Sequence, residues 1–90
     1  MQDDDEAIAS RRKRIHFRSW HRGTQEADLL LGRFADRYLP TMDRDALDQF
    51  EAVLEVPEPD ILAWYLGQES VPGPSRSPIL DLILNFKIYE

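Results

Sequence analysis

Several absences narrow the function of this 90-residue sequence. It has no cysteine, which excludes disulfides and thiolate metal sites. No apolar run approaches the roughly 20 residues that span a bilayer, so we predict no direct membrane insertion. The glycines stand singly and form no phosphate-cradling loop, and no serine lies in a nucleophile elbow. The four glycines are Gly23, Gly32, Gly67 and Gly73.

The titratable residues offer no catalytic or metal centre either. His16 and His21 are too far apart in angle on a helix, roughly 140°, to share a metal, so no metal is predicted. Glu26 near Arg22 could be considered as a general base, but a carboxylate paired with arginine is a poor base. The commoner explanation of such a pair is that it pins a helix junction. We therefore predict a protein that is not an enzyme and has no catalytic residue.

Charge is unevenly distributed along the chain. The net charge is −6, yet six of the eleven Lys and Arg residues lie between Arg11 and Arg22. Such a cluster can bind phosphates, or it can be a solvated helix face that neighbouring acidic helices compensate. The acidic remainder of the chain would repel a polyanion, so we predict no nucleic-acid partner.

The first residues, 1–6, form an acidic block with nothing to bury, and we predict a disordered tail there. This start is unlike a secretory signal or a mitochondrial transit peptide. A bacterial cytoplasmic location is the simplest assignment. Residues 7–90 are expected to form one small domain, since a chain this short builds a single core.

Hydrophobic periodicity and capping residues predict five helices. Thr24, Asp43 and Ser77 are good caps for the second, third and fifth. The fifth segment is apolar and β-branched enough for a strand, but its Ser77-Pro78 entry and the lack of a partner strand favour a helix. The expected spans are 7–20, 25–39, 44–55, 59–66 and 78–88.

The fold class that follows is all-α, a compact five-helix bundle in which short connections make sequential helices antiparallel neighbours. Apolar residues at helical spacing form the predicted core. They are Ile15, Leu30, Phe34, Tyr38, Leu47, Phe50, Leu54, Ile61, Leu62, Tyr65, Ile79, Ile83 and Phe86. The first helix has a thin apolar stripe and is expected to dock through an aromatic from Phe17 or Trp20 as well. Trp64 lies off the best apolar face of the fourth helix, which leaves an exposed interface anchor and a core residue at the bundle edge as alternatives.

Several short motifs together resemble the succinate dehydrogenase assembly (flavinylation) factor family, the SdhE type with its RGxxE signature. They are Arg14-Ile15-His16, Arg22-Gly23-Thr24-Gln25-Glu26 with Asp28, and Pro59-Asp60 followed by Trp64. The resemblance covers nearly all of residues 11–88. His21 departs from it, since relatives can carry another arginine there.

The resemblance implies an assembly factor, or chaperone, that binds the flavoprotein subunit of succinate dehydrogenase, and in some bacteria that of fumarate reductase. It would promote covalent attachment of FAD to that subunit. The FAD belongs to the partner, the chain holds no cofactor of its own, and the free protein is expected to be a monomer. The partner-binding residues carried over are Arg14, His16, Arg22, Gly23, Glu26, Asp28, Asp60 and Trp64.

A second hypothesis is a small helical interaction module that binds an unrelated client through the basic helix 11–22. It explains the basic cluster but not the Pro59-Asp60 and Trp64 element. A nucleic-acid-associated helical protein fits the cluster and fails on overall charge.

Overall fold

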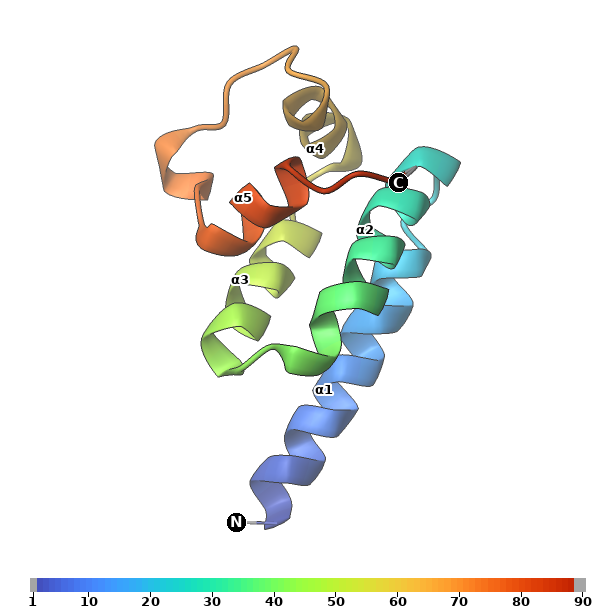
Figure 1. Ribbon diagram of the computed structural model, residues 1–90, viewed down its shortest axis with the longest axis vertical. Helices are drawn as coiled ribbons and strands as arrows, with labels where there is room; N and C mark the ends of the chain where they lie inside the picture. Colours follow the sequence, from blue (N-terminus) through green and yellow to red (C-terminus); the bar gives the residue numbers. More distant parts are fainter. Residues whose placement is uncertain (1, 89–90) are drawn as a thin grey trace.

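The computed structural model describes the backbone of residues 2–88 and the side chains of residues 7–88. Within these residues the chain forms five α-helices and two short 3-10 helices, with no strand, which confirms the predicted all-α class (Figure 1). The α-helices are α1 Gln2–Trp20, α2 Gln25–Tyr38, α3 Arg44–Leu54, α4 Glu58–Tyr65 and α5 Pro78–Leu84. The 3-10 helices are η1 Leu39–Thr41, after α2, and η2 Gly73–Ser75, before α5.

The predicted caps set the starts of the helices. The Asp43 side chain accepts a hydrogen bond from the Ala46 N–H at 2.9 Å at the start of α3. The Ser77 hydroxyl accepts one from the Leu80 N–H at 3.0 Å at the start of α5. Each bond satisfies a backbone donor that has no partner within its helix, which is why the helices begin at these residues.

The first helix is longer than the sequence suggested. Its backbone begins at Gln2 instead of residue 7, so it runs through most of the segment for which a disordered tail was expected. The side chains of residues 2–6 lie outside the described part of the structure, and the division into a tail and a domain at residue 7 stays a prediction.

The most extensive contact between helices joins α1 and α2, and α3 packs on α1 and α5. Helix α1 lies along α2 and also contacts α3, while α5 packs on α3 and touches α2 and α4 (Figure 1). Sequential helices are therefore neighbours for α1 with α2 and for α4 with α5, as predicted. The main partners of α3, however, are α1 and α5, because the η1 turn carries the chain across before α3 begins.

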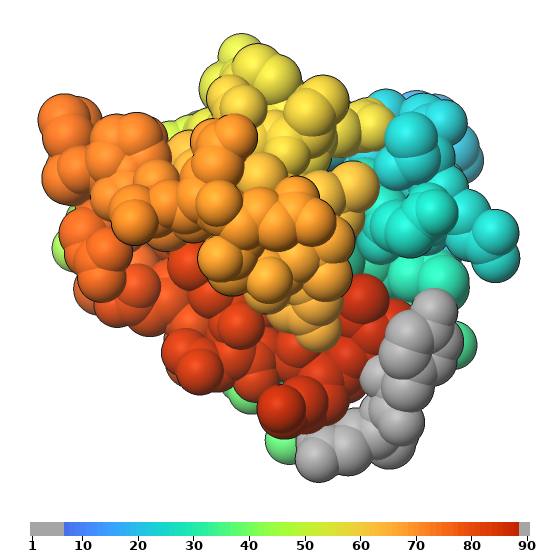
Figure 2. All heavy atoms as spheres, turned by 90° about the horizontal axis from the view of Figure 1, so that it is seen from above, coloured from blue at the N-terminus to red at the C-terminus, as the bar shows by residue number. Residues whose placement is uncertain are grey.

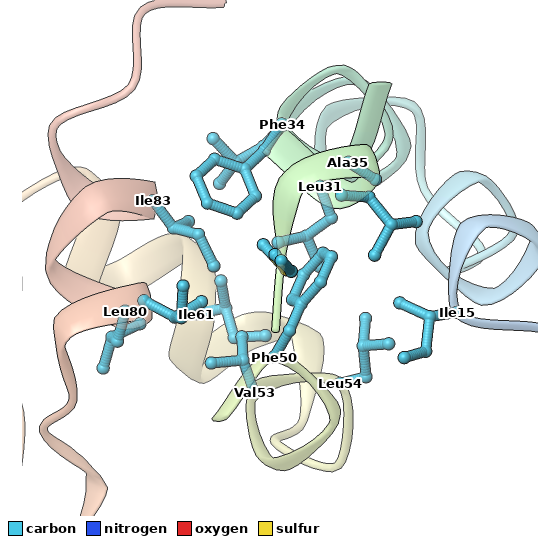
Figure 3. Packing of buried hydrophobic residues seen from close by; sticks show 14 of the residues in the cluster. Ile15, Leu31, Phe34, Ala35, Phe50, Val53, Leu54, Ile61, Leu80 and Ile83 are labelled. Atoms are coloured by element: carbon cyan, nitrogen blue, oxygen red, sulfur yellow. The ribbon is translucent and has the colours of Figure 1, made fainter. Parts of the chain in front are cut away.

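The core lies between α2, α3 and α5, with Ile15 entering from α1 beside Leu54 of α3 (Figure 3). Phe34 and Phe50 meet edge to face, with 5.4 Å between ring centroids, a geometry that aromatic pairs favour. The predicted core residues that prove only half-buried are Tyr38, Leu62, Tyr65 and Phe86. Large buried residues absent from the prediction are Leu31, Leu39, Met42, Val53 and Leu80.

Candidate functional site

The turn between α1 and α2 carries the residues singled out in the sequence. Gly23 has a φ of 117°, a conformation that side-chain-bearing residues rarely adopt. The Thr24 hydroxyl then accepts a hydrogen bond from the Ala27 N–H at 3.3 Å and caps α2, as predicted. The turn is therefore a defined structure that a glycine permits and a threonine closes.

Arg22 points into the molecule. Its side chain is 11% exposed. Its Nη1 donates to the Leu54 carbonyl oxygen at 2.5 Å, and its Nη2 donates to that of Val56 at 2.8 Å. These carbonyls lie at the end of α3, where the helix leaves acceptors without an internal partner. The guanidinium therefore caps the C-terminus of α3 from a turn more than thirty residues earlier in the chain.

The acidic neighbour of Arg22 is Glu58, at the start of α4. Arg22 Nε lies 3.9 Å from Glu58 Oε1, and a Cβ placed on Gly23 would lie 3.4 Å from the same oxygen. The sequence suggested that Arg22 pairs with Glu26 to pin the helix junction. That interpretation is wrong in its partner: Glu26 is exposed on the first turn of α2, and Arg22 pins the junction through α3 and α4 instead.

The side chain of Asp28 stabilises the turn through a hydrogen bond to its backbone. Its Oδ1 accepts a hydrogen bond from the Arg22 backbone N–H at 2.6 Å. The bond runs back from the first turn of α2 and closes the connection between the two helices. This carboxylate is partly buried and has a structural partner, whereas the nearby carboxylate of Glu26 stands in solvent.

His16 and Trp20 bind one carboxylate on α2. His16 Nε2 lies 2.6 Å from Asp36 Oδ1, and the Trp20 Nε1–H donates to the same oxygen at 3.1 Å. His16 remains 49% exposed. Trp20 is thus the aromatic that docks α1 onto α2, and Phe17, the other residue considered for that role, is 61% exposed.

Trp64 is a core residue. It is 9% exposed and belongs to the buried cluster together with Ile61 of the same helix. Of the two alternatives left open by the sequence, the residue at the edge of the core is therefore confirmed, and the exposed anchor is wrong. Asp60, one turn earlier, is exposed.

The basic residues of α1 divide into two groups. Arg11 donates to Asp48 and, at 2.5 Å, to Glu51, both on α3. These hydrogen bonds, with Asp48 first and Glu51 second, raise the pKa of Arg11 above its ordinary value against the opposing effect of burial. Arg18 donates to Glu55 at 2.6 Å. For these arginines the interpretation of a basic face compensated by an acidic helix is confirmed.

The opposite face of α1 has a feature that the sequence analysis missed. The rings of Phe17 and His21 are stacked, with centroids 3.9 Å apart and planes at 13°, and His21 Nδ1 lies 2.7 Å from the Phe17 carbonyl oxygen. Arg14 and Lys13 are also exposed, and neither forms an ion pair with any side chain that the structure describes. The sequence does contain a signal for this stack: the two rings are four residues apart, a spacing that makes side chains neighbours on the surface of a helix.

A shallow hollow at the turn is lined by Trp20, His21, Gly23, Thr24, Gln25, Asp28 and Leu29. Figure 2 shows the turn beside the residues that begin α4. Among the described residues there is no group of three or more His, Asp or Glu placed to hold a metal. No helix in that part of the chain combines the length and the apolarity needed to cross a membrane.

Residues 13–87 match the protein family described as "Flavinator of succinate dehydrogenase", named Sdh5. The matched segment contains the whole α1–α2 turn and continues almost to the end of the chain. It covers well over half of the sequence.

Individual relatives agree with this match. The "FAD assembly factor SdhE" of Acetobacter pasteurianus is 37% identical over 76 residues, which are 84% of this chain and 70% of the relative. Two proteins named "Succinate dehydrogenase assembly factor 2, mitochondrial" are also similar. That of Debaryomyces hansenii is 41% identical over 90 residues, 100% of this chain and 60% of the relative. That of Yarrowia lipolytica is 35% identical over 80 residues, which cover 84% of this chain and 55% of the relative. The chain thus spans less than two thirds of the length of both mitochondrial relatives.

Proposed function

The chain belongs to the Sdh5/SdhE family of succinate dehydrogenase flavinators, and from this premise we propose that it binds the flavoprotein subunit and promotes covalent attachment of FAD to it. It acts as an assembly factor and not as an enzyme. The observation that carries the proposal is the family match over residues 13–87, which includes the turn with Arg22, Gly23 and Glu26. The FAD belongs to the partner, and the chain supplies a surface.

The proposed contact surface consists of the predicted site residues that remain exposed. They are Arg14, His16, Gly23, Glu26 and Asp60. Glu26 is the centre of this surface, because it projects from a turn whose backbone is held by the Thr24 cap and by the Asp28 bond to Arg22. A carboxylate on a fixed backbone loses little freedom on binding and so holds its partner in a defined orientation.

Such a surface promotes a reaction without taking part in it. A chaperone that binds one conformation of its client more tightly than the others shifts the population toward that conformation. If the favoured conformation brings FAD against its acceptor side chain, the covalent bond forms faster through proximity alone. The flavoprotein of fumarate reductase could be served in the same way. Free protein is proposed to be monomeric and to pair with its client one to one.

The test is covalent flavin in the flavoprotein subunit, read as in-gel fluorescence after denaturation. The assay compares no factor, wild type, Glu26→Gln and Asp60→Asn. We expect the initial rate to fall by about tenfold or more for Glu26→Gln, the scale expected when a charge paired across an interface is removed. Glu69→Gln is the matched control, because Glu69 is an exposed glutamate in the loop before α5.

Circular dichroism confirms beforehand that each variant is folded. Wild-type protein that leaves flavin attachment unchanged, with a competent flavoprotein and FAD present, would contradict the proposal. Equal losses for Glu26→Gln and Glu69→Gln would refute the assignment of the surface to this turn.

An unrelated client recruited by the basic helix 11–22 is less well supported. Arg11 and Arg18 are engaged by acids of α3, and Arg12 Nη2 donates to the Met42 carbonyl oxygen at 2.6 Å. Little of the basic cluster is left for a client beyond Lys13 and Arg14. The absence of a nucleic-acid partner and a bacterial cytoplasmic location remain predictions.

A further inference from the structure

We infer that Arg22 is a positioning residue that clamps two distant turns of the chain together and does not itself contact the flavoprotein. The clamp joins the α1–α2 turn, which carries Glu26, to the connection between α3 and α4, which leads to Asp60. This inference rests on the proposed function for its consequence, but its structural part can be tested on the protein alone.

The guanidinium of Arg22 is bonded at both of its terminal nitrogens. Two of its nitrogens donate to carbonyls of the α3–α4 connection, those of Leu54 and Val56. A planar fork matches two backbone acceptors that are two residues apart, whereas a lysine ammonium is a single point of donation. With both Nη groups occupied and a side chain 11% exposed, Arg22 has little left to offer a partner.

The remaining nitrogen of the guanidinium, Arg22 Nε, faces the carboxylate of Glu58. Arg22 Nε is buried and has no hydrogen-bond acceptor among the described residues, while Glu58 Oε1 lies 3.9 Å away. The Glu58 side chain is only 19% exposed. The carboxylate thus compensates the charge of a guanidinium that is mostly removed from water, a requirement for burying a charge. Glu58 is the second half of the clamp.

Gly23, the residue after Arg22, lies against the same carboxylate. The carboxylate of Glu58 fits against the backbone of Gly23, where a Cβ would meet Oε1 at 3.4 Å. A side chain at this position would strain the backbone at a φ of 117°, while its Cβ would stand in ordinary van der Waals contact with the carboxylate that balances Arg22. Arginine and glycine are thus adjacent because one makes the clamp and the other permits the backbone conformation that turns the chain beside it.

The consequence is a division within the Arg22–Glu26 segment. Arg22 and Gly23 hold the turn against the α3–α4 connection, and Glu26 is left free for the partner. Because Glu58 and Asp60 belong to the same helix, the clamp also sets where Asp60 stands relative to Glu26.

The first experiment is hydrogen–deuterium exchange on the free protein, comparing wild type, Arg22→Met and Glu26→Gln. We expect Arg22→Met to speed exchange in both 23–28 and 54–60 by about tenfold to a hundredfold, the scale set by losing two charge-assisted hydrogen bonds. Glu26→Gln should change neither segment. Unchanged exchange at 54–60 in Arg22→Met would overturn the inference, whatever the flavin assay shows.

The second experiment measures binding to the flavoprotein subunit at several salt concentrations, at a temperature where every variant is folded. For a clamp, Arg22→Met lowers the affinity and leaves the salt dependence of binding unchanged, whereas Glu26→Gln lowers both. A salt dependence that falls with Arg22→Met would show a direct charge contact and overturn the inference.

Arg22→Lys covers the case in which Arg22→Met does not fold. It keeps the positive charge but cannot bridge the two carbonyls. A clamp predicts faster exchange at 54–60 and weakened binding for this variant, while full retention of both would overturn the inference. If wild-type protein fails to promote flavin attachment, the proposed function fails, but the exchange result still decides whether the clamp exists.

Discussion

Helix α1 carries arginines both on the face toward α3 and away from it. The arginines toward α3 are paired with acids, whereas Arg14 is exposed and has no such partner among the described residues. On the face toward α3, Arg11 and Arg18 flank the buried Ile15 and are paired with acids. Away from that face, Arg14 and Phe17 are exposed, and Phe17 stacks on His21. A helix of about 3.6 residues per turn brings positions seven apart back to one side, whereas Phe17, two residues after Ile15, is turned roughly 160° away from it. One basic run therefore serves both the fold and the surface.

The largest difference between the two faces is expected for substitution of Ile15, the apolar residue at the centre of the face toward α3. Ile15 is 1% exposed, whereas Phe17 is 61% exposed. We expect Ile15→Ala to lower the free energy of unfolding by about 2–5 kcal/mol, the cost of a cavity in a packed core. Phe17→Ala is the control on the outer face, where we expect a change of at most about 1 kcal/mol, because only the ring stack is lost.

Urea denaturation followed by circular dichroism measures both values. Similar losses for the two variants would show that α1 does not divide into a structural and an exposed face. Binding of the flavoprotein to the folded Phe17→Ala variant would show, in the same preparation, whether the exposed ring contributes to the interface.

A smaller effect is expected where α1 meets α2. A Cβ on Gly32 would lie 2.2 Å from the Trp20 ring, and Trp20 is held in place by its bond to Asp36. Alanine is a better helix former than glycine by about 1 kcal/mol, but forcing the ring away costs about 1–3 kcal/mol or more. We therefore expect Gly32→Ala to destabilise the protein on balance.

The matched control for this variant is Gly73→Ala, since nothing lies within 4 Å of a Cβ at Gly73. Thermal unfolding of the two variants is the measurement. A Gly32→Ala protein as stable as Gly73→Ala would mean that the helices separate without cost, contrary to the close approach of Trp20 to Gly32.

The smallest effect is expected for the paired charges. Arg11→Met removes the bonds to Asp48 and Glu51, and we expect a loss of at most about 1 kcal/mol, because these groups are partly solvated and screened. Arg14→Met should leave the stability unchanged. The difference between the two variants should shrink in 1 M salt. If Arg14→Met destabilised the protein as much as Arg11→Met, the two faces would not differ in their use of charge.

Local signals in the sequence predicted much of the fold. Thr24, Asp43 and Ser77 act within three residues of themselves, so their roles as caps could be read from the chain. The apolar stripes of α2 and α3 likewise predicted Phe34 and Phe50 in the core, because burial follows helical periodicity. The start of α1 was placed too late, since an acidic segment has no apolar stripe to mark it.

The candidate site was predicted less completely. The sequence identified the Arg22–Glu26 segment, and its family resemblance agrees with the match over residues 13–87. It could not show that Arg22 turns inward to α3 or that Glu58 is its acidic neighbour, because those residues are more than thirty positions away. It also left Trp64 undecided, since a short helix has two faces and only packing selects one.

The sequence by itself determined that five helices form, that Thr24, Asp43 and Ser77 cap three of them, and that the chain turns at Gly23, because each of these depends on residues within a few positions of one another. Tertiary structure alone decided which charges face inward, which carboxylate balances Arg22 and which residues remain free for a partner. Those outcomes depend on the packing of helices distant in sequence, where a difference of one position on a helix turns a side chain from the core to the solvent.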